Sequence, residues 1–168
     1  MTTCLYIYRT PAAFDNLAVT GDDEALTGLH FTPKEAPDDA AARASLPLPL
    51  REACRWLDLY FSGHAPNFLP PYRLEGATPF RKAVCERLLR IPFGATATYG
   101  DIARELAVAM GVERMSAQAV GGAVGWNPIC LVIPCHRVVG AGGTLTGYGG
   151  GLANKAALLA HEARKLPL

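Results

Sequence analysis

The stretch DIARELAVAMGVERMSAQAVGGAVGWNP, residues 101–128, decides how the second half of this 168-residue chain folds. Residues 101–110 carry apolar side chains at helical spacing, and Gly111 marks a helix end because glycine adopts the left-handed conformation easily. Ser116 then caps a second helix, AQAVGGAVGW, which the Asn-Pro pair at 127–128 terminates because a residue before proline disfavours the helical conformation. A helix, a short break and a second helix together predict a helix-turn-helix.

The second of these helices is built mainly from small residues. Gly121, Gly122 and Gly125 each weaken a helix by up to ~1 kcal/mol relative to alanine. A helix of ordinary width, about 10–12 Å, enters only the major groove of DNA, whereas the minor groove is about 6 Å wide. A slim helix is therefore suited to pressing against a minor groove, although close packing against another helix explains the same composition.

Signals on both sides of this stretch extend the pattern into a larger domain. Threonine as a cap and proline in the first turn are typical of a helix start. In chain order the predicted elements are a helix that begins at Thr78-Pro79 and runs to about Arg90, a turn-rich connection over 91–100, a buried strand over 129–139 with a break at Pro134, a glycine-rich loop over 140–151 and a last helix over 152–165. On the last helix Leu158 and Glu162 are four residues apart and share one face.

The first half predicts a small α/β unit over residues 1–75, which leaves 76–168 as the second domain. Turn residues separate short β-branched or aromatic stretches, which is typical of a hairpin sheet. The predicted elements are strands at 3–8, 16–20 and 25–31, a turn at 21–23, an irregular connection at 33–49, a helix over 50–62 that Gly63 ends, and a linker over 64–77. Cys4, His30 and His64 have no metal-ligand spacing, so no metal site is expected.

Composition narrows the class of protein. Half of the residues are hydrophobic, which argues against disorder, and no apolar run reaches the roughly 18 residues of a membrane span. The start MTTCLYIYRT lacks the basic-then-apolar order of a signal peptide. Five cysteines without framework spacing indicate free thiols in a reducing compartment. We therefore expect a cytoplasmic protein that does not contact membranes.

Charge is distributed unevenly along the chain. Residues 1–75 contain 6 Lys/Arg and 10 Asp/Glu, a net charge of −4, whereas residues 76–168 contain 10 and 5, a net charge of +5. A basic second half suits a polyanionic partner such as DNA. A chance distribution over a solvated surface explains the same numbers, so the asymmetry permits DNA binding without demonstrating it.

The sharpest chemical feature is Pro-Cys-His at 134–136. A cysteine nucleophile must be a thiolate, and a free thiol with a pKa of ~8.5 is mostly protonated at neutral pH. His136 is a candidate base for Cys135, although neighbouring side chains on a regular strand point to opposite faces, so a bend or a bridging water is needed. Glu162 is a candidate partner for the imidazole because buried carboxylates seldom lack one.

Together these features resemble the methylated-DNA–protein-cysteine methyltransferases. The resemblance rests on MSAQAVGGAVGWNP (115–128) and IPCHRVVGAGGTLTGYGGGLANKAALLAHE (133–162), with TPFRKAVCERLLRIPFGATATYGDIA (78–103) as a front end. In the first half it is limited to the strand pattern and LDLYFSGHAPNF (57–68). It implies a ribonuclease-H-like sheet plus helix, followed by a mostly helical, winged-helix-like domain. It also implies a monomer that acts on double-stranded DNA containing alkylated guanine, through the minor groove and without a cofactor.

The resemblance also assigns roles to individual residues. Cys135 is the acceptor of the alkyl group, His136 its base through a bound water, and Glu162 the residue that orients His136. Asn127 braces the recognition helix against the backbone near Cys135, and Tyr99 donates to the extruded guanine. The same resemblance places Tyr148, Gly149, Val138 and Val124 around the extruded base, and Arg114, Ser116, Gln118, Ala119 and Gly122 at the DNA.

One residue departs from the family pattern. Most members have an arginine two residues before the Val-Gly-Gly, where it fills the gap that the extruded base leaves. This chain has Gln118 there, which can hydrogen-bond the orphaned partner base but lacks the charge and reach of a guanidinium. We expect weaker DNA binding or another wedge, with Arg114 or Met115 of the long connection over 107–115 as candidates.

Three other classes of function remain open at this stage. An alkyltransferase-like protein that flags lesions lacks the reactive cysteine, which this chain retains. A Cys-His hydrolase needs an oxyanion hole and a direct Cys-His contact. A transcription factor with a helix-turn-helix usually carries Arg, Asn or Gln along its reading helix, where this chain has only Gln118 and Asn127. A stoichiometric alkyl transfer to Cys135 is the favoured hypothesis.

Overall fold

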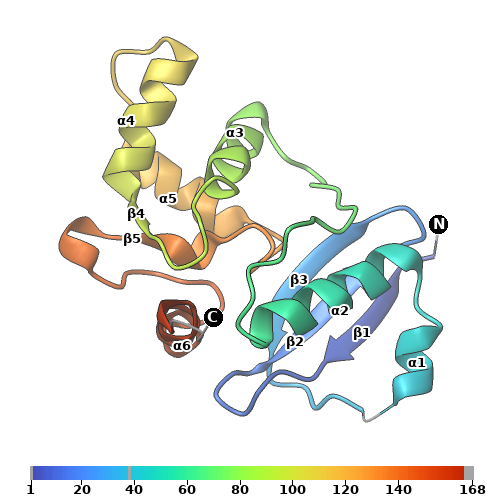
Figure 1. The fold of residues 1–168 in the computed structure, drawn as a ribbon. Helices are drawn as coiled ribbons and strands as arrows, with labels where there is room; N and C mark the ends of the chain where they lie inside the picture. The colour runs from blue at the N-terminus through green and yellow to red at the C-terminus, as the bar shows by residue number, and fades with distance from the viewer. Residues whose placement is uncertain (1, 38, 165–168) are drawn as a thin grey trace. The chain divides into compact units, whose positions relative to one another are not determined.

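The chain forms two compact units in a computed structural model that describes residues 2–37 and 39–164 (Figure 1). The first unit reaches to Glu75, and the second consists of Gly76–Ala163. None of the helices in the described ranges combines the length and apolar character that a membrane span requires.

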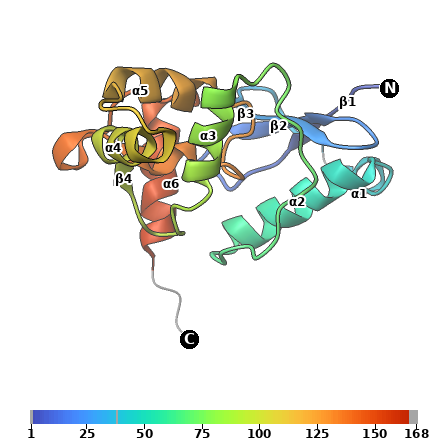
Figure 2. The same ribbon diagram turned by 90° about the horizontal axis from the view of Figure 1, so that it is seen from above.

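The first unit is a three-stranded antiparallel sheet with one long helix against it. The strands β1 (Cys4–Tyr8), β2 (Asn16–Gly21) and β3 (Leu26–Thr32) follow one another in the sheet, as the sequence predicts. Alternate residues of β2, Leu17 and Val19 among them, are buried, which is the pattern of a sheet with one covered face. Figures 1 and 2 both show α2 (Leu48–Phe61) lying along that sheet.

The turns of the first unit use polar side chains. Asp22, in the turn after β2, accepts hydrogen bonds from the backbone N–H groups of Glu24 and Ala25. Its carboxylate also forms an ion pair with the guanidinium of Arg73, with an N···O distance of 2.7 Å. The connection before α2 is less irregular than predicted, because Asp39 caps a short helix, α1 (Ala40–Ala44). Both features fix the ends of elements rather than create a site.

The second unit is mostly helical. Its helices are α3 (Pro79–Leu88), α4 (Tyr99–Met110), α5 (Ala117–Trp126) and α6 (Leu152–Ala163), and a short parallel pair joins β4 (Ala97–Thr98) to β5 (Val138–Val139). Thr78, Thr98 and Ser116 each cap the following helix through the side-chain oxygen. Gly111 ends α4 with a φ of 67°. The predicted order of helix, break and helix is confirmed, and α3, α4 and α5 pack against one another.

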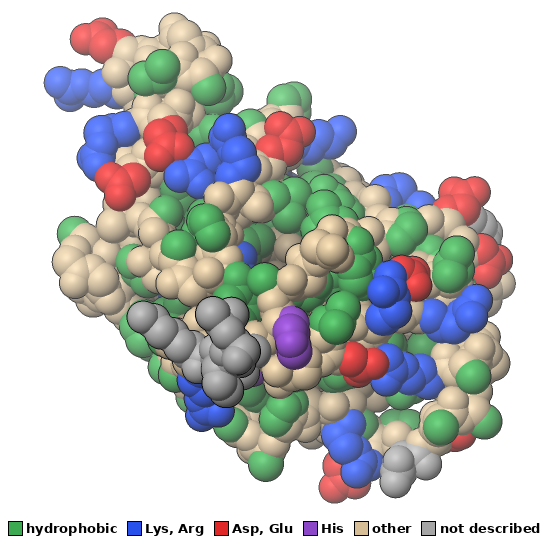
Figure 3. Space-filling view, in the orientation of Figure 1, with side chains coloured by type: hydrophobic (Ala, Val, Ile, Leu, Met, Phe, Trp, Pro, Cys, Tyr) green, Lys and Arg blue, Asp and Glu red, His purple; other side chains and the backbone are tan. Residues whose placement is uncertain are grey.

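Charged side chains of α3 and α4 neutralise each other. Arg87 of α3 pairs with Glu105 of α4, and within α4 Arg104 pairs with Asp101. In Figure 3 the basic and acidic side chains above these helices are correspondingly interspersed. The excess positive charge of the second half therefore does not form a continuous basic patch on this face.

The strand predicted over residues 129–139 is wrong except for its last two residues. The segment is buried, but a 3₁₀ helix, Cys135–Arg137, follows a series of tight turns. Leu131 has a φ of 67°, the only non-glycine residue with positive φ in the described part of the chain. A short apolar run does not distinguish a strand from another buried segment, and Pro134 cannot donate to a sheet.

Candidate active site

Cys135 lies at the start of the 3₁₀ helix and is only 4% exposed. Asn127, which ends α5, holds the turn that precedes it. The Asn127 side-chain amide donates to the carbonyl of Ile133 at 2.8 Å, and its oxygen accepts from the N–H of Ile129 at 3.0 Å. These two bonds replace the sheet partners that the segment lacks. The end of α5 and the position of Cys135 are therefore linked through one buried side chain.

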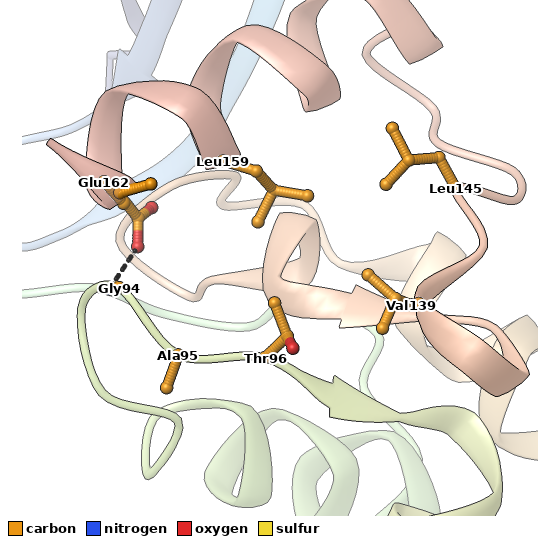
Figure 4. Close-up of a pocket in the computed structure, with 9 residues that line it drawn as sticks. Gly94, Ala95, Thr96, Val139, Leu145, Leu159 and Glu162 are labelled. Atoms are coloured by element: carbon orange, nitrogen blue, oxygen red, sulfur yellow. Dashed lines mark hydrogen bonds between the residues drawn. The ribbon is translucent and has the colours of Figure 1, made fainter.

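Glu162 of α6 gathers the groups behind Cys135. One oxygen of its carboxylate is hydrogen-bonded to Nε2 of His136. The other accepts from Nε of Arg137 at 2.6 Å and from the backbone N–H of Gly94 at 3.1 Å, the bond drawn in Figure 4. His136 is fully buried, and Glu162 is 5% exposed. The structure thus brings together His136 and Glu162, as predicted, and adds Arg137, which the sequence analysis did not assign.

The charges of this group follow from burial and pairing. Burial acts to raise the pKa of Glu162, but His136 and Arg137 together lower it to about 2. Burial lowers the pKa of His136, and the neighbouring Glu162 only partly offsets this. At neutral pH Glu162 is therefore an anion and His136 is neutral. A neutral ring whose Nε2–H donates to Glu162 has its lone pair on Nδ1, which is the form that a general base requires.

The thiolate form of Cys135 is stabilised relative to that of an ordinary cysteine. Its pKa is lowered chiefly by a hydrogen bond from the Cys130 thiol, which outweighs burial, and Asn127 and Tyr148 lower it further. Burial in an apolar setting alone would have the opposite effect, as it does for the thiol of Cys54, whose pKa it raises to about 11. Cys135 is therefore set apart from a structural cysteine by the groups around it.

Lys155 of α6 is a second buried cation of the site. Its ammonium group donates to the carbonyls of Val138 at 2.6 Å and Thr146 at 3.1 Å, and it lies 5.9 Å from the ring centroid of Tyr148. Burial lowers its pKa, and the nearby Cys135 charge opposes that effect. Lys155 was not predicted as a site residue, although its spacing of three and seven residues from Leu158 and Glu162 places it on the same helix face.

Tyr99 begins α4 and is half-buried. Burial raises its pKa, a hydrogen bond with Thr146 opposes the shift, and the charge of Cys135 adds to it. Its ring packs against Gly121 of α5, where an added Cβ would lie 3.8 Å from the ring. Tyr99 and Cys135, both predicted site residues, therefore lie within electrostatic reach of each other. Thr98 caps the helix that begins with Tyr99.

The remaining predicted residues fall into two groups. Val124 and Val138 are buried, Tyr148 is half-buried and Gly149 is exposed. On α5 and the residues before it, five predicted positions are each exposed: Arg114, Ser116, Gln118, Ala119 and Gly122. None of the described residues lies within 4 Å of a Cβ built at Gly122 or Gly125. The contact at Gly121 is an ordinary van der Waals distance, so packing inside the described chain does not require glycine at any of these three positions.

A cavity of about 220 Å³ is lined in part by Glu162 (Figure 4). Its lining is largely apolar and includes Val139, Leu145 and Leu159. Cys135 and His136 do not line it, so it is separate from the reactive sulfur. Among residues 2–37 and 39–164, no three His, Cys, Asp or Glu side chains are placed to hold a metal ion.

Comparison with known proteins gives a consistent result. Residues 79–164 match the family model described as 6-O-methylguanine DNA methyltransferase, DNA binding domain. The chain is 40% identical over 161 residues to a methylated-DNA–protein-cysteine methyltransferase of Mycolicibacterium paratuberculosis, covering 95% of this chain and 94% of that protein.

Solved structures extend the comparison. A variant of the Mycobacterium tuberculosis O6-methylguanine methyltransferase superposes with a TM-score of 0.78 at 35% identity, covering 99% of this chain and 96% of that one. The M. tuberculosis protein in complex with DNA gives a TM-score of 0.73 at 36% identity, covering 94% and 92%. The similarity therefore extends over both units of the chain.

The Glu162 pairing predicts a pH-dependent contribution to stability. Replacing Glu162 by glutamine leaves the Arg137 guanidinium buried without its counter-charge, so we expect a loss of about 3–5 kcal/mol in the free energy of unfolding at pH 7. The lowered pKa means that the carboxylate stabilises the fold above pH 4.5 and that this contribution is lost as the pH falls toward 2. Urea unfolding at several pH values measures the difference.

Glu105→Gln is the matched control, because Glu105 is half-exposed where it pairs with Arg87 and the pair should contribute at most about 1 kcal/mol. A Glu162→Gln variant as stable as this control at pH 7 would contradict the assignment. So would a gap between wild type and Glu162→Gln that does not narrow on acidification.

Proposed function

The chain belongs to the family of methylated-DNA–protein-cysteine methyltransferases, and we propose that Cys135 is the sulfur that accepts the alkyl group. The reaction is direct-reversal repair, in which the alkyl group of a damaged base in DNA moves irreversibly to a cysteine of the protein itself. The observation that carries the assignment is a buried thiol whose pKa is lowered, next in sequence to a hydrogen-bonded His136–Glu162 pair.

In the proposed step the Cys135 thiolate attacks the alkyl carbon on O6 of guanine. A carbon–sulfur bond forms, the carbon–oxygen bond breaks and the electron pair goes to the guanine. His136 takes the thiol proton through a water, because the bond between its Nε2 and Glu162 leaves the ring to act through Nδ1. Glu162 orients the ring and stabilises the imidazolium that forms. A thioether is a poor leaving group, so one transfer uses up the protein.

Negative charge develops on the guanine ring as the bond to oxygen breaks. A phenol that donates to a ring nitrogen stabilises this leaving group. Tyr99 fits the role because it lies close enough to Cys135 for that charge to raise its pKa. The raised pKa keeps the hydroxyl proton available for donation. We therefore assign Tyr99 as the donor to the extruded base.

The alkyl carbon is shielded within a DNA duplex, so the base must leave the stack at a cost of a few kcal/mol. We place it between Val138 and the segment Gly147–Gly149, which carries Tyr148. Lys155 supports both walls of this site through its bonds to the carbonyls of Val138 and Thr146. A carbonyl oxygen has two lone pairs, so Val138 can still accept from the polar edge of a base.

The DNA would approach the exposed side of α5. Gly122 and Gly125 leave open space there, which suits contact with a groove about 6 Å wide. Ser116 and Ala119 expose the start of the same helix, where backbone N–H groups favour phosphate. Gln118 would enter the gap left by the base, with Arg114 close by in sequence as a phosphate contact. The substrate is thus double-stranded DNA with O6-methylguanine or, as an extension, O4-methylthymine, bound through the minor groove.

We extend the proposal to the fold type of each unit, the domain bounds, the cellular compartment and the oligomeric state. The sheet with α2 is described as ribonuclease-H-like, and the packed helices α3, α4 and α5 beside the β4–β5 pair as winged-helix-like. The first domain takes residues 1–75, and DNA binding and alkyl transfer take 76–168. Five cysteines without a disulfide suit the cytoplasm, and the protein would act as a monomer.

The proposal predicts one alkyl group per protein. After incubation with duplex DNA that contains O6-methylguanine, intact mass spectrometry should show a single added methyl, and peptide mapping should place it on Cys135. Cys135→Ser should take up none, whereas Cys54→Ser, a change at a buried thiol of the first unit, should behave as wild type. Repeated turnover would contradict stoichiometric transfer, and binding of methylated DNA without an adduct would favour a protein that only flags the lesion.

The departure at Gln118 predicts a substrate-dependent effect. Gln118→Ala should slow methyl transfer from duplex DNA and leave transfer from the free O6-methylguanine base unchanged, because the free base needs no extrusion. Gln118→Arg should tighten binding to duplex DNA and, if the guanidinium meets a phosphate, steepen the slope of log affinity against log salt by about 0.9. Single-turnover rates on the two substrates measure the first effect. An unchanged duplex rate for Gln118→Ala would exclude Gln118 as the wedge.

A further inference from the structure

A second thiol lies beside Cys135. The Cys130 thiol lies beside the sulfur of Cys135: it is the group that lowers the pKa of Cys135 most, and Tyr148 lowers the pKa of both cysteines. Both residues are buried, Cys130 at 8% and Cys135 at 4% exposure. Alkyl transfer uses only the sulfur of Cys135. A role for the neighbouring thiol of Cys130 therefore has to come from another reaction.

The backbone explains how the two sulfurs come together although four residues lie between the two cysteines. The N–H of Ile133 bonds the carbonyl of Ile129 at 3.1 Å, and the N–H of Val132 bonds that of Cys130 at 2.8 Å. Leu131 adopts a positive φ of 67° inside this turn. An extended chain would place residues five apart at roughly 16–18 Å, far beyond the Cα separation of about 4.4–6.8 Å that a disulfide needs. The folded turn shortens the distance between Cys130 and Cys135 relative to an extended chain.

The two thiols differ in reactivity in the way that a redox pair requires. The pKa of Cys135 is lowered by the hydrogen bond from Cys130, and the pKa of Cys130 is raised by the same contact and by burial. Cys135 is therefore the sulfur that ionises more readily and attacks an oxidant, and Cys130 is the one that holds its proton more strongly. Reactive redox cysteines are low-pKa thiols poised next to a resolving cysteine.

We propose that Cys130 and Cys135 form a reversible disulfide when the protein meets hydrogen peroxide. The Cys135 thiolate attacks one peroxide oxygen, the O–O bond breaks, and hydroxide leaves and takes up a proton to become water. Cys135 is then a sulfenic acid. The Cys130 sulfur attacks the Cys135 sulfur, the S–O bond breaks, and the departing hydroxide takes the Cys130 proton as a second water. Two thiols are oxidised and one peroxide is reduced.

The disulfide would protect the acceptor sulfur. A sulfenic acid without a neighbouring thiol proceeds to sulfinic acid, which is irreversible in most proteins. The bond to Cys130 stops that course, blocks alkyl transfer while it lasts and releases the thiolate on reduction. Because both sulfurs are nearly inaccessible, the oxidant must be small, and a bulky disulfide such as oxidised glutathione should react slowly.

Cys85 of α3 is the competing partner. It is buried, its pKa is raised to about 11 by burial and by the charge of Cys135, and it therefore lies within electrostatic reach of Cys135. No hydrogen bond between Cys85 and Cys135 contributes to either pKa, in contrast to Cys130. We therefore expect the disulfide of Cys135 to form with Cys130 and not with Cys85. Cys85→Ser is accordingly a matched control for Cys130→Ser.

The test treats the full-length protein with hydrogen peroxide, caps the remaining thiols with iodoacetamide and digests it with trypsin. Both cysteines fall in the peptide 115–137, between Arg114 and Val138. We expect this peptide to be two hydrogens lighter than its reduced form and uncapped, and dithiothreitol to restore both thiols. Cys85→Ser should give the same result. Cys130→Ser and Cys130→Ala should instead carry sulfinic acid on Cys135.

The proposal goes beyond alkyl transfer, and this readout involves no DNA, so it stands or fails separately from the proposed function. A wild-type peptide with sulfinic acid at Cys135 and no disulfide would overturn it, as would a bond from Cys135 to Cys85. As a second measurement, oxidised wild type should take up no methyl from methylated DNA until it is reduced. Full methyl uptake by protein with the disulfide intact would overturn the protective role.

Discussion

The carboxylate of Glu162 is the constraint on which the rest of the site depends. It stands near the end of α6 and binds donors from two other parts of the second unit, the backbone of Gly94 and the side chains of His136 and Arg137. Arg137 also reaches the carbonyl of Ile91 at 2.7 Å. A single buried anion therefore ties α6 to the segment after α3 and to the 3₁₀ helix that begins with Cys135. Without it, two buried donors of the 3₁₀ helix would lose their acceptor.

Charge balance explains how this arrangement produces a nucleophile. Arg137 neutralises Glu162, so burial dominates at His136 and keeps the ring neutral, which leaves it able to accept a proton. On the other side, Cys130 and Asn127 stabilise negative charge on Cys135 against the cost of burial. These residues thus place a neutral, basic imidazole and an ionisable thiol in one buried core. The low dielectric of that core strengthens each of the interactions that hold them.

Much of this molecule follows from sequence patterns whose physical cause is local. The caps Thr78 and Ser116 and the terminator Gly111 act within one helical turn, so the helices that they delimit were predicted with their bounds nearly correct. The segment 129–139 was mispredicted because an apolar run signals burial but not conformation. Arg137 and Cys130 were missed for another reason: their roles depend on partners that only the fold brings near, and Lys155 alone had a spacing that could have indicated its place.

Proton transfer from Cys135 requires His136 to be neutral at neutral pH, with its proton on Nε2 facing Glu162. Nitrogen-15 NMR of the histidine rings tests this directly, because the two ring nitrogens report both the charge and the tautomer. We expect a neutral His136 with the proton on Nε2 at pH 7, and protonation only below the ordinary histidine range. A doubly protonated ring at pH 7, or a proton on Nδ1, would contradict it.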